Sequence, residues 1–70
     1  MELEPIVKVG DQYRIYYGED NLNNVQRLHI LAIIERQVMF KYWTRRGWRY
    51  CLESSHWFKL LNEKGYLIKL

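Results

Sequence analysis

The sequence predicts a single all-β domain, a small barrel of five to six strands that spans residues 1–70. Three observations predict it. Apolar and polar residues alternate over several short segments with the period of two that half-buried strands have. Four glycines stand singly between these segments, where turns are needed. Three Trp, six Tyr and two Phe residues supply large core side chains, which matter because so short a chain buries only about 60% of its unfolded surface.

The N-terminal half is predicted to contain one short strand and one long apolar strand. Residues 1–6 are expected to be a loosely ordered lead-in. Gly10-Asp11 predicts a turn, and residues 12–17 alternate as a strand before a polar loop over residues 18–24. The run from Val25 to Ile34 is too apolar for simple alternation, which is typical of a strand that is covered on both sides or bent across a barrel.

The central part is predicted to continue as a meander. Residues 35–37 form a tight polar turn, although they contain no Gly or Asn. Residues 38–43 alternate again, and Thr44-Arg45-Arg46-Gly47 predicts a hairpin loop with Gly47 in the left-handed region. The return strand covers residues 48–52, so most of the aromatic rings and the densest positive charge lie in or near this meander.

The C-terminal part is predicted to begin with a short helical turn near residues 53–57, which Ser54 or Ser55 can cap. A strand over residues 58–61 and a last strand over residues 66–70 follow. The alternative is one helix from residue 55 to residue 64 that ends at Gly65, and the strand version is the expectation.

The alternation also predicts which side chains face inward. On the return strand, Trp48, Tyr50 and Leu52 are expected to share one face, and Arg49 and Cys51 the other. The expected core consists of Val9, Tyr13, Ile15, Leu28, Ile30, Ala32, Ile33, Val38, Phe40, Tyr42, Tyr50, Leu52, Phe58 and Leu60.

The order of these elements resembles that of the Src-homology-3-like small barrels, including the Tudor-like branch. The residues that carry the resemblance are Val9-Gly10-Asp11, Ile30 to Ile33, the Val38-x-Phe40-x-Tyr42 strand and the ending Glu53 to Leu60, so it covers about residues 8–61. Small bacterial and bacteriophage proteins of unassigned role have the same look. The resemblance implies a module that binds peptides, methylated side chains, RNA or DNA, and a fold does not choose among these. Lys41-Tyr42-Trp43 replaces the Asp-Tyr-Gly signature that is common in Tudor domains.

Positive charge is concentrated in the middle of the chain. Residues 1–20 contain two basic and five acidic side chains, whereas residues 21–50 contain six basic side chains and one acidic side chain. Arginine supplies nearly all of this central charge, and its planar fork suits carboxylate or phosphate recognition. An ordinary solvated sheet face is the plainer explanation.

The predicted binding site is a basic and aromatic cluster on the hairpin. Lys41, Trp43 and Arg49 are expected to share its outward face, with Arg45 and Arg46 at the tip. Trp, Tyr and Arg are enriched in protein interfaces, whereas arginines with exposed rings also suit phosphates and bases. The predicted function is therefore a non-catalytic protein-binding module, such as a phage-type modulator or inhibitor of a host complex, and the alternative is a nucleic-acid-binding accessory protein. The complete predicted site is Arg36, Lys41, Trp43, Arg45, Arg46, Trp48 and Arg49.

Other kinds of site have weaker support. An aromatic cage for a methylated ammonium would need Tyr13, Tyr42, Trp48, Tyr50 and Trp57 to converge. Cys51 and His56 can be drawn as nucleophile and base, but their spacing has no established geometry. One Cys and two His do not make a structural zinc site, so neither a metal nor a cofactor nor an enzymatic activity is expected.

The expected setting is cytoplasmic and free of membrane. A single free Cys fits a reducing compartment, the acidic N-terminus lacks the apolar region of a signal peptide, and no apolar run is long enough to span a bilayer. A homodimer is possible, since a second copy would supply burial that so small a core lacks.

Overall fold

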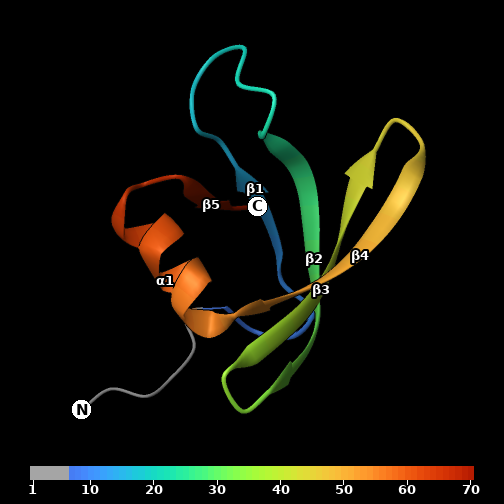
Figure 1. The fold of residues 1–70 in the computed structure, drawn as a ribbon, viewed down its shortest axis with the longest axis vertical. Coiled ribbons are helices and arrows are strands. Elements are labelled where there is room, and N and C mark those ends of the chain that lie inside the picture. Colours follow the sequence, from blue (N-terminus) through green and yellow to red (C-terminus); the bar gives the residue numbers. More distant parts are fainter. Residues whose placement is uncertain (1–6) are drawn as a thin grey trace.

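Five antiparallel strands and one helix make up residues 7–70, which are the residues that the computed structural model describes (Figure 1). The lead-in predicted for residues 1–6 lies outside the described residues. The elements are β1 (Gln12–Ile15), β2 (Val25–Ile34), β3 (Gln37–Thr44), β4 (Gly47–Ser54), α1 (Ser55–Glu63) and β5 (Leu67–Lys69).

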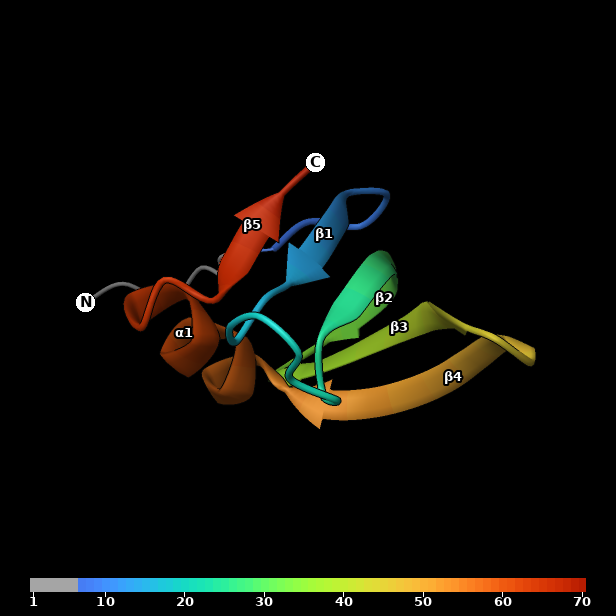
Figure 2. The ribbon, with the colours of Figure 1, turned by 90° about the horizontal axis from the view of Figure 1, so that it is seen from above.

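The strands form one sheet in the order β4-β3-β2-β1-β5, in which all neighbours are antiparallel. The predicted all-β class is confirmed, and the five strands fall within the predicted five to six. The sheet is strongly bent but open, with β4 and β5 as its two borders, so the described residues do not close a barrel. Figure 2 shows the β3–β4 hairpin extending away from α1 and β5.

The core lies between the sheet and α1. Phe40 of β3 is at its centre, where it packs edge-on against Phe58 with ring centroids 5.3 Å apart and stacks on Trp57 at 5.9 Å. Val7, which precedes the first turn, is fully buried, whereas the predicted core residue Val9 is 59% exposed. The buried core consists of Val7, Tyr13, Ile15, Leu28, Ile30, Val38, Phe40, Phe58 and Leu61.

The region after β4 is a helix of nine residues, so the predicted helical turn followed by a strand is wrong. The Ser54 side chain caps the helix, because its Oγ accepts a hydrogen bond from the Trp57 backbone N–H over 3.2 Å. Helical spacing places Phe58 and Leu61 on one buried face. Strand alternation would instead have buried Leu60, which is 40% exposed.

A bulge explains the unusually apolar β2. Ile30 pairs with Phe40 and Ala32 pairs with Met39, so Leu31 is an extra residue without a partner on β3. Leu28 and Ile30 face the core before the bulge, and Ile33, which pairs with the buried Val38, faces it afterwards. The change of phase therefore produces an apolar run although only one side of this sheet packs on the core.

The facing predicted for the return strand is reversed. Arg45 and Arg46 connect the paired residues Thr44 and Gly47, and this register sets Phe40 opposite Cys51 and Lys41 opposite Tyr50. Directly opposite residues share a face. Cys51 therefore packs against the core, and Tyr50 faces away from it.

The inward placement expected for Tyr50 and Leu52 is consequently wrong. Tyr50 is 70% exposed and Leu52 is 54% exposed, whereas the expected core residues Ala32, Ile33 and Tyr42 are half-buried. The predicted core failed on β4 because the turn, not the apolarity of the strand, sets which side chains point inward.

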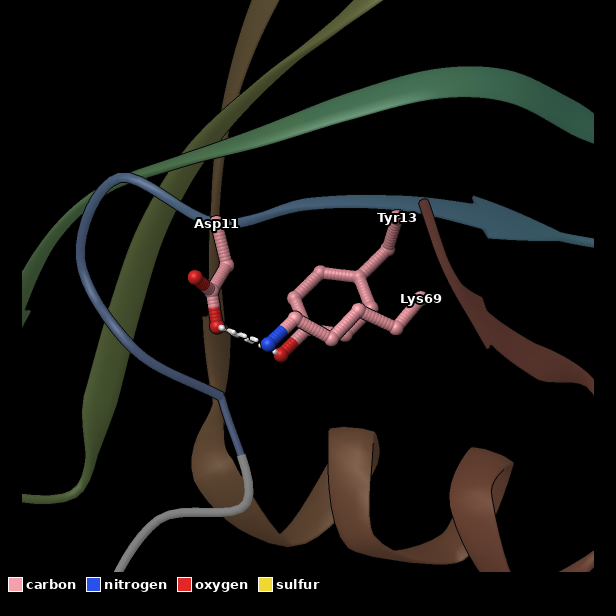
Figure 3. Close-up of polar contacts among 3 residues, drawn as sticks. All are labelled: Asp11, Tyr13 and Lys69. Atoms are coloured by element: carbon pink, nitrogen blue, oxygen red, sulfur yellow. Dashed lines mark hydrogen bonds and ion pairs between the residues drawn. The ribbon is translucent and has the colours of Figure 1, made fainter.

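Strand β1 pairs with β2 and β5, and a small polar cluster at its start adds a contact to β5 (Figure 3). The Tyr13 hydroxyl donates a hydrogen bond to Asp11 Oδ2 over 3.1 Å. The same oxygen lies 3.6 Å from the Lys69 ammonium of β5. The cluster joins the first turn to the last strand.

Candidate binding surface

The side of the sheet that faces away from α1 and the core is called the open face here. On β3 and β4 it carries Lys41, Trp43, Trp48 and Tyr50, because Trp43 pairs with Trp48 and Lys41 pairs with Tyr50. Met39 and Leu52, another directly opposite pair, continue the face toward the β2–β3 turn. These side chains form a partly exposed aromatic and apolar surface.

Trp48 is the centre of this surface. Its ring packs edge-on against Trp43 at 5.2 Å and against His29 of β2 at 4.8 Å between ring centroids. The Lys41 ammonium lies 4.5 Å from the centroid of the Trp48 ring. Three neighbours thus fix Trp48, while Trp43 remains 48% exposed. A partner would meet rings that are already ordered, which lowers the entropic cost of binding.

His29 supports the aromatic cluster from below. Its Nε2 atom is buried and has no hydrogen-bond partner within the described residues. Burial lowers the pKa of His29, and the positive charges of Lys41 and Arg27 lower it further. The neutral imidazole is therefore the form that fits between β2 and Trp48.

The open face is basic as well as aromatic. Arg14 alternates with the buried Tyr13 and Ile15, and Arg27 precedes the buried Leu28, so both arginines join Lys41 on this face. Among residues 7–70 the acids lie in turns and loops, in α1 or, for Glu53, on the core side of β4. The open face therefore carries an excess of positive charge.

Arg45 and Arg46 stand at the tip of the β3–β4 hairpin next to the open face. The Thr44 side chain orders this turn, because its Oγ1 accepts from the Arg46 N–H over 3.1 Å and donates to the Gly47 carbonyl over 2.8 Å. Gly47 has φ of +111°, a conformation that other residues rarely adopt, as predicted. Both arginines are exposed.

The structure separates the predicted site into three places. Lys41, Trp43 and Trp48 lie together on the open face, with Arg45 and Arg46 at its end. Arg36 lies in the β2–β3 turn, at the opposite end of β3 (Figure 1). Arg49 pairs with Tyr42 and so belongs to the core side of the sheet, which corrects the prediction that it shares a face with Lys41.

Sequence reasoning omitted three residues of the open face. They are Arg14, Arg27 and His29. The signal that places them is their alternation with residues that are buried in the core. Because β2 is so apolar, the sequence interpretation treated it as core scaffold. Its outward side chains Arg27 and His29 were therefore given no role in binding.

A hollow lies on the core side of the sheet. It is a broad groove of about 860 Å³ between the loop of residues 18–24 and the β3–β4 hairpin. Asn24 orders the loop, since its Oδ1 accepts from the Tyr17 N–H and its Nδ2 donates to the Gly18 carbonyl, each over 2.7 Å. Residues along the groove include Phe40, Tyr42, Cys51 and Trp57.

The proposed five-ring cage is not assembled. Tyr42 and Trp57 line the groove, but Tyr13 is buried in the core. Trp48 and Tyr50 lie on the opposite side of the sheet. The rings therefore do not converge on one ligand.

Cys51 and His56, the pair considered as nucleophile and base, lie on β4 and α1. Cys51 is half-buried against the core, His56 is exposed in the first turn of α1, and no hydrogen bond joins the two among the described residues. No group of three His, Cys, Asp or Glu side chains gathers there to hold a metal ion. The one helix within residues 7–70 is too short to cross a bilayer.

Comparisons with protein-family models, curated proteins and solved structures find no match to this chain. The resemblance to Src-homology-3-like barrels therefore stays a prediction.

Proposed function

We propose that this chain is a non-catalytic protein-binding module whose partner docks on the open face of β3 and β4. One observation carries the proposal: Trp43, Trp48 and Lys41 form an ordered aromatic and cationic cluster on a sheet face that no element of residues 7–70 covers. Trp, Tyr and Arg dominate the energetics of protein interfaces. Exposed apolar patches of this kind mark interaction sites.

Charge and apolarity together define the partner. Arg14, Arg27, Lys41, Arg45 and Arg46 surround the aromatic end of the face with positive charge, so a matching surface is acidic there. The other end carries aliphatic side chains, Met39, Leu52 and the 65% exposed Ile34. The partner surface that complements both ends combines carboxylates with apolar side chains.

This combination favours a protein over a nucleic acid. Exposed rings and cations suit the bases and phosphates of a nucleic acid as well as they suit a protein. Nucleic acid is therefore the alternative partner. The aliphatic end of the open face has no counterpart in a polyanion, whereas it matches the apolar centre of a protein interface. A role as phage-type modulator of a host complex stays a prediction, because no residue of the face specifies the partner's identity.

A capture experiment with matched variants tests the proposal. The chain is immobilised and exposed to extract of the source cell, and each captured protein is then purified for affinity measurements. Trp43→Ala is expected to weaken binding of the true partner at least roughly thirtyfold, the cost of about 2 kcal/mol that a central Trp typically carries. Lys59→Ala on exposed α1 is the control and leaves the affinity unchanged.

The same proteins separate the two macromolecular classes. Binding to generic duplex and single-stranded DNA and RNA is measured at about 50 mM salt, where phosphate contacts are strongest. Undetectable binding there removes the nucleic-acid alternative. Tight nucleic-acid binding that Trp43→Ala abolishes replaces the protein proposal, and captured proteins that bind Trp43→Ala as well as the native chain overturn the open face as the site.

A further inference from the structure

The outer edge of β4 is an unused row of backbone hydrogen-bonding groups. The Ser55 N–H donates to the Arg36 carbonyl over 2.7 Å, and this bond continues the register of the β3–β4 ladder. Odd-numbered positions of β4 therefore direct their N–H and C=O groups at β3. By the alternation of antiparallel ladders, Trp48, Tyr50 and Leu52 direct theirs outward, as does the N–H of Ser54, whose carbonyl begins α1 as the N-cap. No other strand of residues 7–70 pairs with that edge.

This edge lacks most of the features that usually protect a sheet border, although it carries the two charged residues Arg49 and Glu53. It is eight residues long, it contains neither Pro nor Lys, and its ladder with β3 runs without a bulge. The other border, β5, is only three residues long and includes Lys69. In Figure 2 β4 bounds the sheet along its whole length, with β3 on its inner side. A border of this kind is a template for strand addition.

We propose that two copies of this chain pair through antiparallel β4 strands, with Cys51 of one copy directly opposite Cys51 of the second. The outward backbone groups of Tyr50 then meet those of Leu52 in the second copy, and the Trp48 carbonyl meets the Ser54 N–H. The two sheets become one sheet of ten strands with a two-fold axis between the Cys51 residues. The proposal is independent of the partner that docks on the open face.

Charge complementarity selects this register. In it, Arg49 lies opposite Glu53 of the second copy, and Glu53 lies opposite Arg49, so the two-fold axis creates two cross-strand ion pairs. Both side chains are on the core side of the sheet, and neither makes an ion pair within residues 7–70. Opposite charges on directly opposed residues stabilise a sheet, and like charges destabilise it.

Apolar complementarity selects the same register. Tyr50 and Leu52 are 70% and 54% exposed on the open face of the single chain. In the paired dimer, Tyr50 of each copy packs against Leu52 of the other copy. These two contacts remove apolar surface from water that the isolated chain leaves exposed. The open faces of the two copies become continuous through these pairs.

The neighbouring registers lose these contacts. Outward groups must meet outward groups, so the pairing can shift only in steps that keep even-numbered residues opposite one another. Setting Tyr50 opposite Tyr50 leaves Arg49 facing Cys51 and Glu53 facing Gly47. Setting Leu52 opposite Leu52 leaves Glu53 facing Cys51 and moves Arg49 beyond the end of the partner strand. Only the register centred on Cys51 pairs both charges.

Charge reversal tests the pairing. Sedimentation or light scattering between about 10 μM and 1 mM is expected to show a concentration-dependent dimer, since an interface of one strand pair is smaller than the standard of about 1,600 Å². Arg49→Glu and Glu53→Arg each place like charges opposite one another and shift the equilibrium at least roughly tenfold toward monomer. The double variant Arg49→Glu with Glu53→Arg restores the native equilibrium.

The helix supplies a matched control. Lys59 and Glu63 are exposed on α1 and are also four residues apart, so Lys59→Glu and Glu63→Arg repeat the charge changes away from β4 and leave dimerisation unchanged. A chain that is monomeric at 1 mM overturns the proposal. A dimer that withstands both β4 reversals, or that the double variant does not restore, overturns it equally.

Disulfide trapping tests the register of the β4–β4 pairing without charge-reversal variants. This second test is needed if a charge-reversal variant does not fold. Directly opposite residues that do not share ladder bonds have Cα atoms about 4.5 Å apart, within the range that a disulfide spans. The oxidant diamide accepts the two hydrogens that the two Cys51 thiols lose when they form a disulfide. Because the two thiols are close, the native chain is expected to crosslink rapidly. The control is a Lys59→Cys variant in a Cys51→Ser background. Position 59 is more exposed than Cys51. Crosslinking of Cys51 no faster than this control overturns the Cys51-centred register.

Discussion

The Lys41 ammonium lies 4.5 Å from the centroid of the Trp48 ring, across the β3–β4 pair on the open face. This contact joins the positive charge and the aromatic surface on which the proposed function depends. The Trp48 ring also packs edge-on against Trp43 and His29, so one side chain organises the cluster. Trp48 is half-buried because its neighbours surround it, although it faces away from the core.

Lys41→Gln is expected to lower the free energy of unfolding by about 0.5 kcal/mol, the value of a cation–π contact at a partly exposed site. Urea unfolding measures the change. In a double-mutant cycle with Trp48→Leu, Lys41→Gln then has no further effect, because its partner ring is absent. Lys59→Gln on exposed α1 is the control with no loss, and an equal loss in both backgrounds contradicts the contact.

The stability of the fold is expected to fall as the pH is lowered below about 6.5. His29 has its pKa lowered by burial and by the charges of Lys41 and Arg27, so the unfolded chain binds a proton at a pH where the folded chain does not. Stability is complete above the unfolded pKa of about 6.5 and is lost as the pH falls toward the lowered folded value. Urea midpoints between pH 7.5 and 5 measure this dependence.

Two variants assign that dependence to one residue. His29→Phe keeps an aromatic ring against Trp48 but removes the titrating group, so its midpoint is expected to vary less over this range. His56→Gln changes the exposed histidine of α1 and retains the native dependence. If His29→Phe is as sensitive to pH as the native chain, the lowered pKa does not control stability here.

Alkaline stability is expected to depend on Tyr13. Burial, the hydrogen bond to Asp11 and the Asp11 charge together raise the pKa of Tyr13 to about 12. Between pH 10 and 12 the unfolded state loses this proton while the folded state keeps it, so stability falls as the pH rises through that range. The loss reaches at most roughly 2–3 kcal/mol.

Tyr13→Phe tests that assignment by unfolding at pH 8 and pH 11. The variant loses about 1 kcal/mol at pH 8, because Asp11 loses a hydrogen-bond donor, and it shows a smaller further loss at pH 11 than the native chain. Tyr16→Phe, at an exposed position outside β1, is the control and keeps the native alkaline loss. Equal alkaline losses in all three proteins contradict the role of Tyr13.

Substitutions in α1 distinguish the observed helix from the predicted strand. Leu61→Ala is expected to lower the free energy of unfolding by about 2–4 kcal/mol, since Leu61 packs in the core beside Phe58. Leu60→Ala costs less than about 1 kcal/mol, because Leu60 is on the outer side of the helix. The reverse order of the two losses in thermal or urea unfolding would support strand alternation at residues 58–61.

The approximate place of five strands followed from the sequence because it depends on local patterning. Alternation around Tyr13 and Ile15, the apolar run of β2 and the Gly47 turn each act over a few residues, so the sequence contains the complete signal. The capping role of Ser54 is equally local. The helix that it begins was assigned wrongly because the short apolar run at residues 58–61 satisfies the strand and the helix period alike.

The composition of the candidate binding surface depended on tertiary structure. Alternation divides β4 into two sets of side chains but does not say which set faces the core. Pairing across the Arg45-Arg46 turn decides it by setting Cys51 against the buried Phe40, which places Tyr50 on the open face and the exposed Arg49 on the core side of the sheet. The sequence by itself determined that a basic, aromatic hairpin exists. Only the register of that hairpin decided which rings and charges share a face, because a side-chain period of two makes each strand's facing a property of its partner.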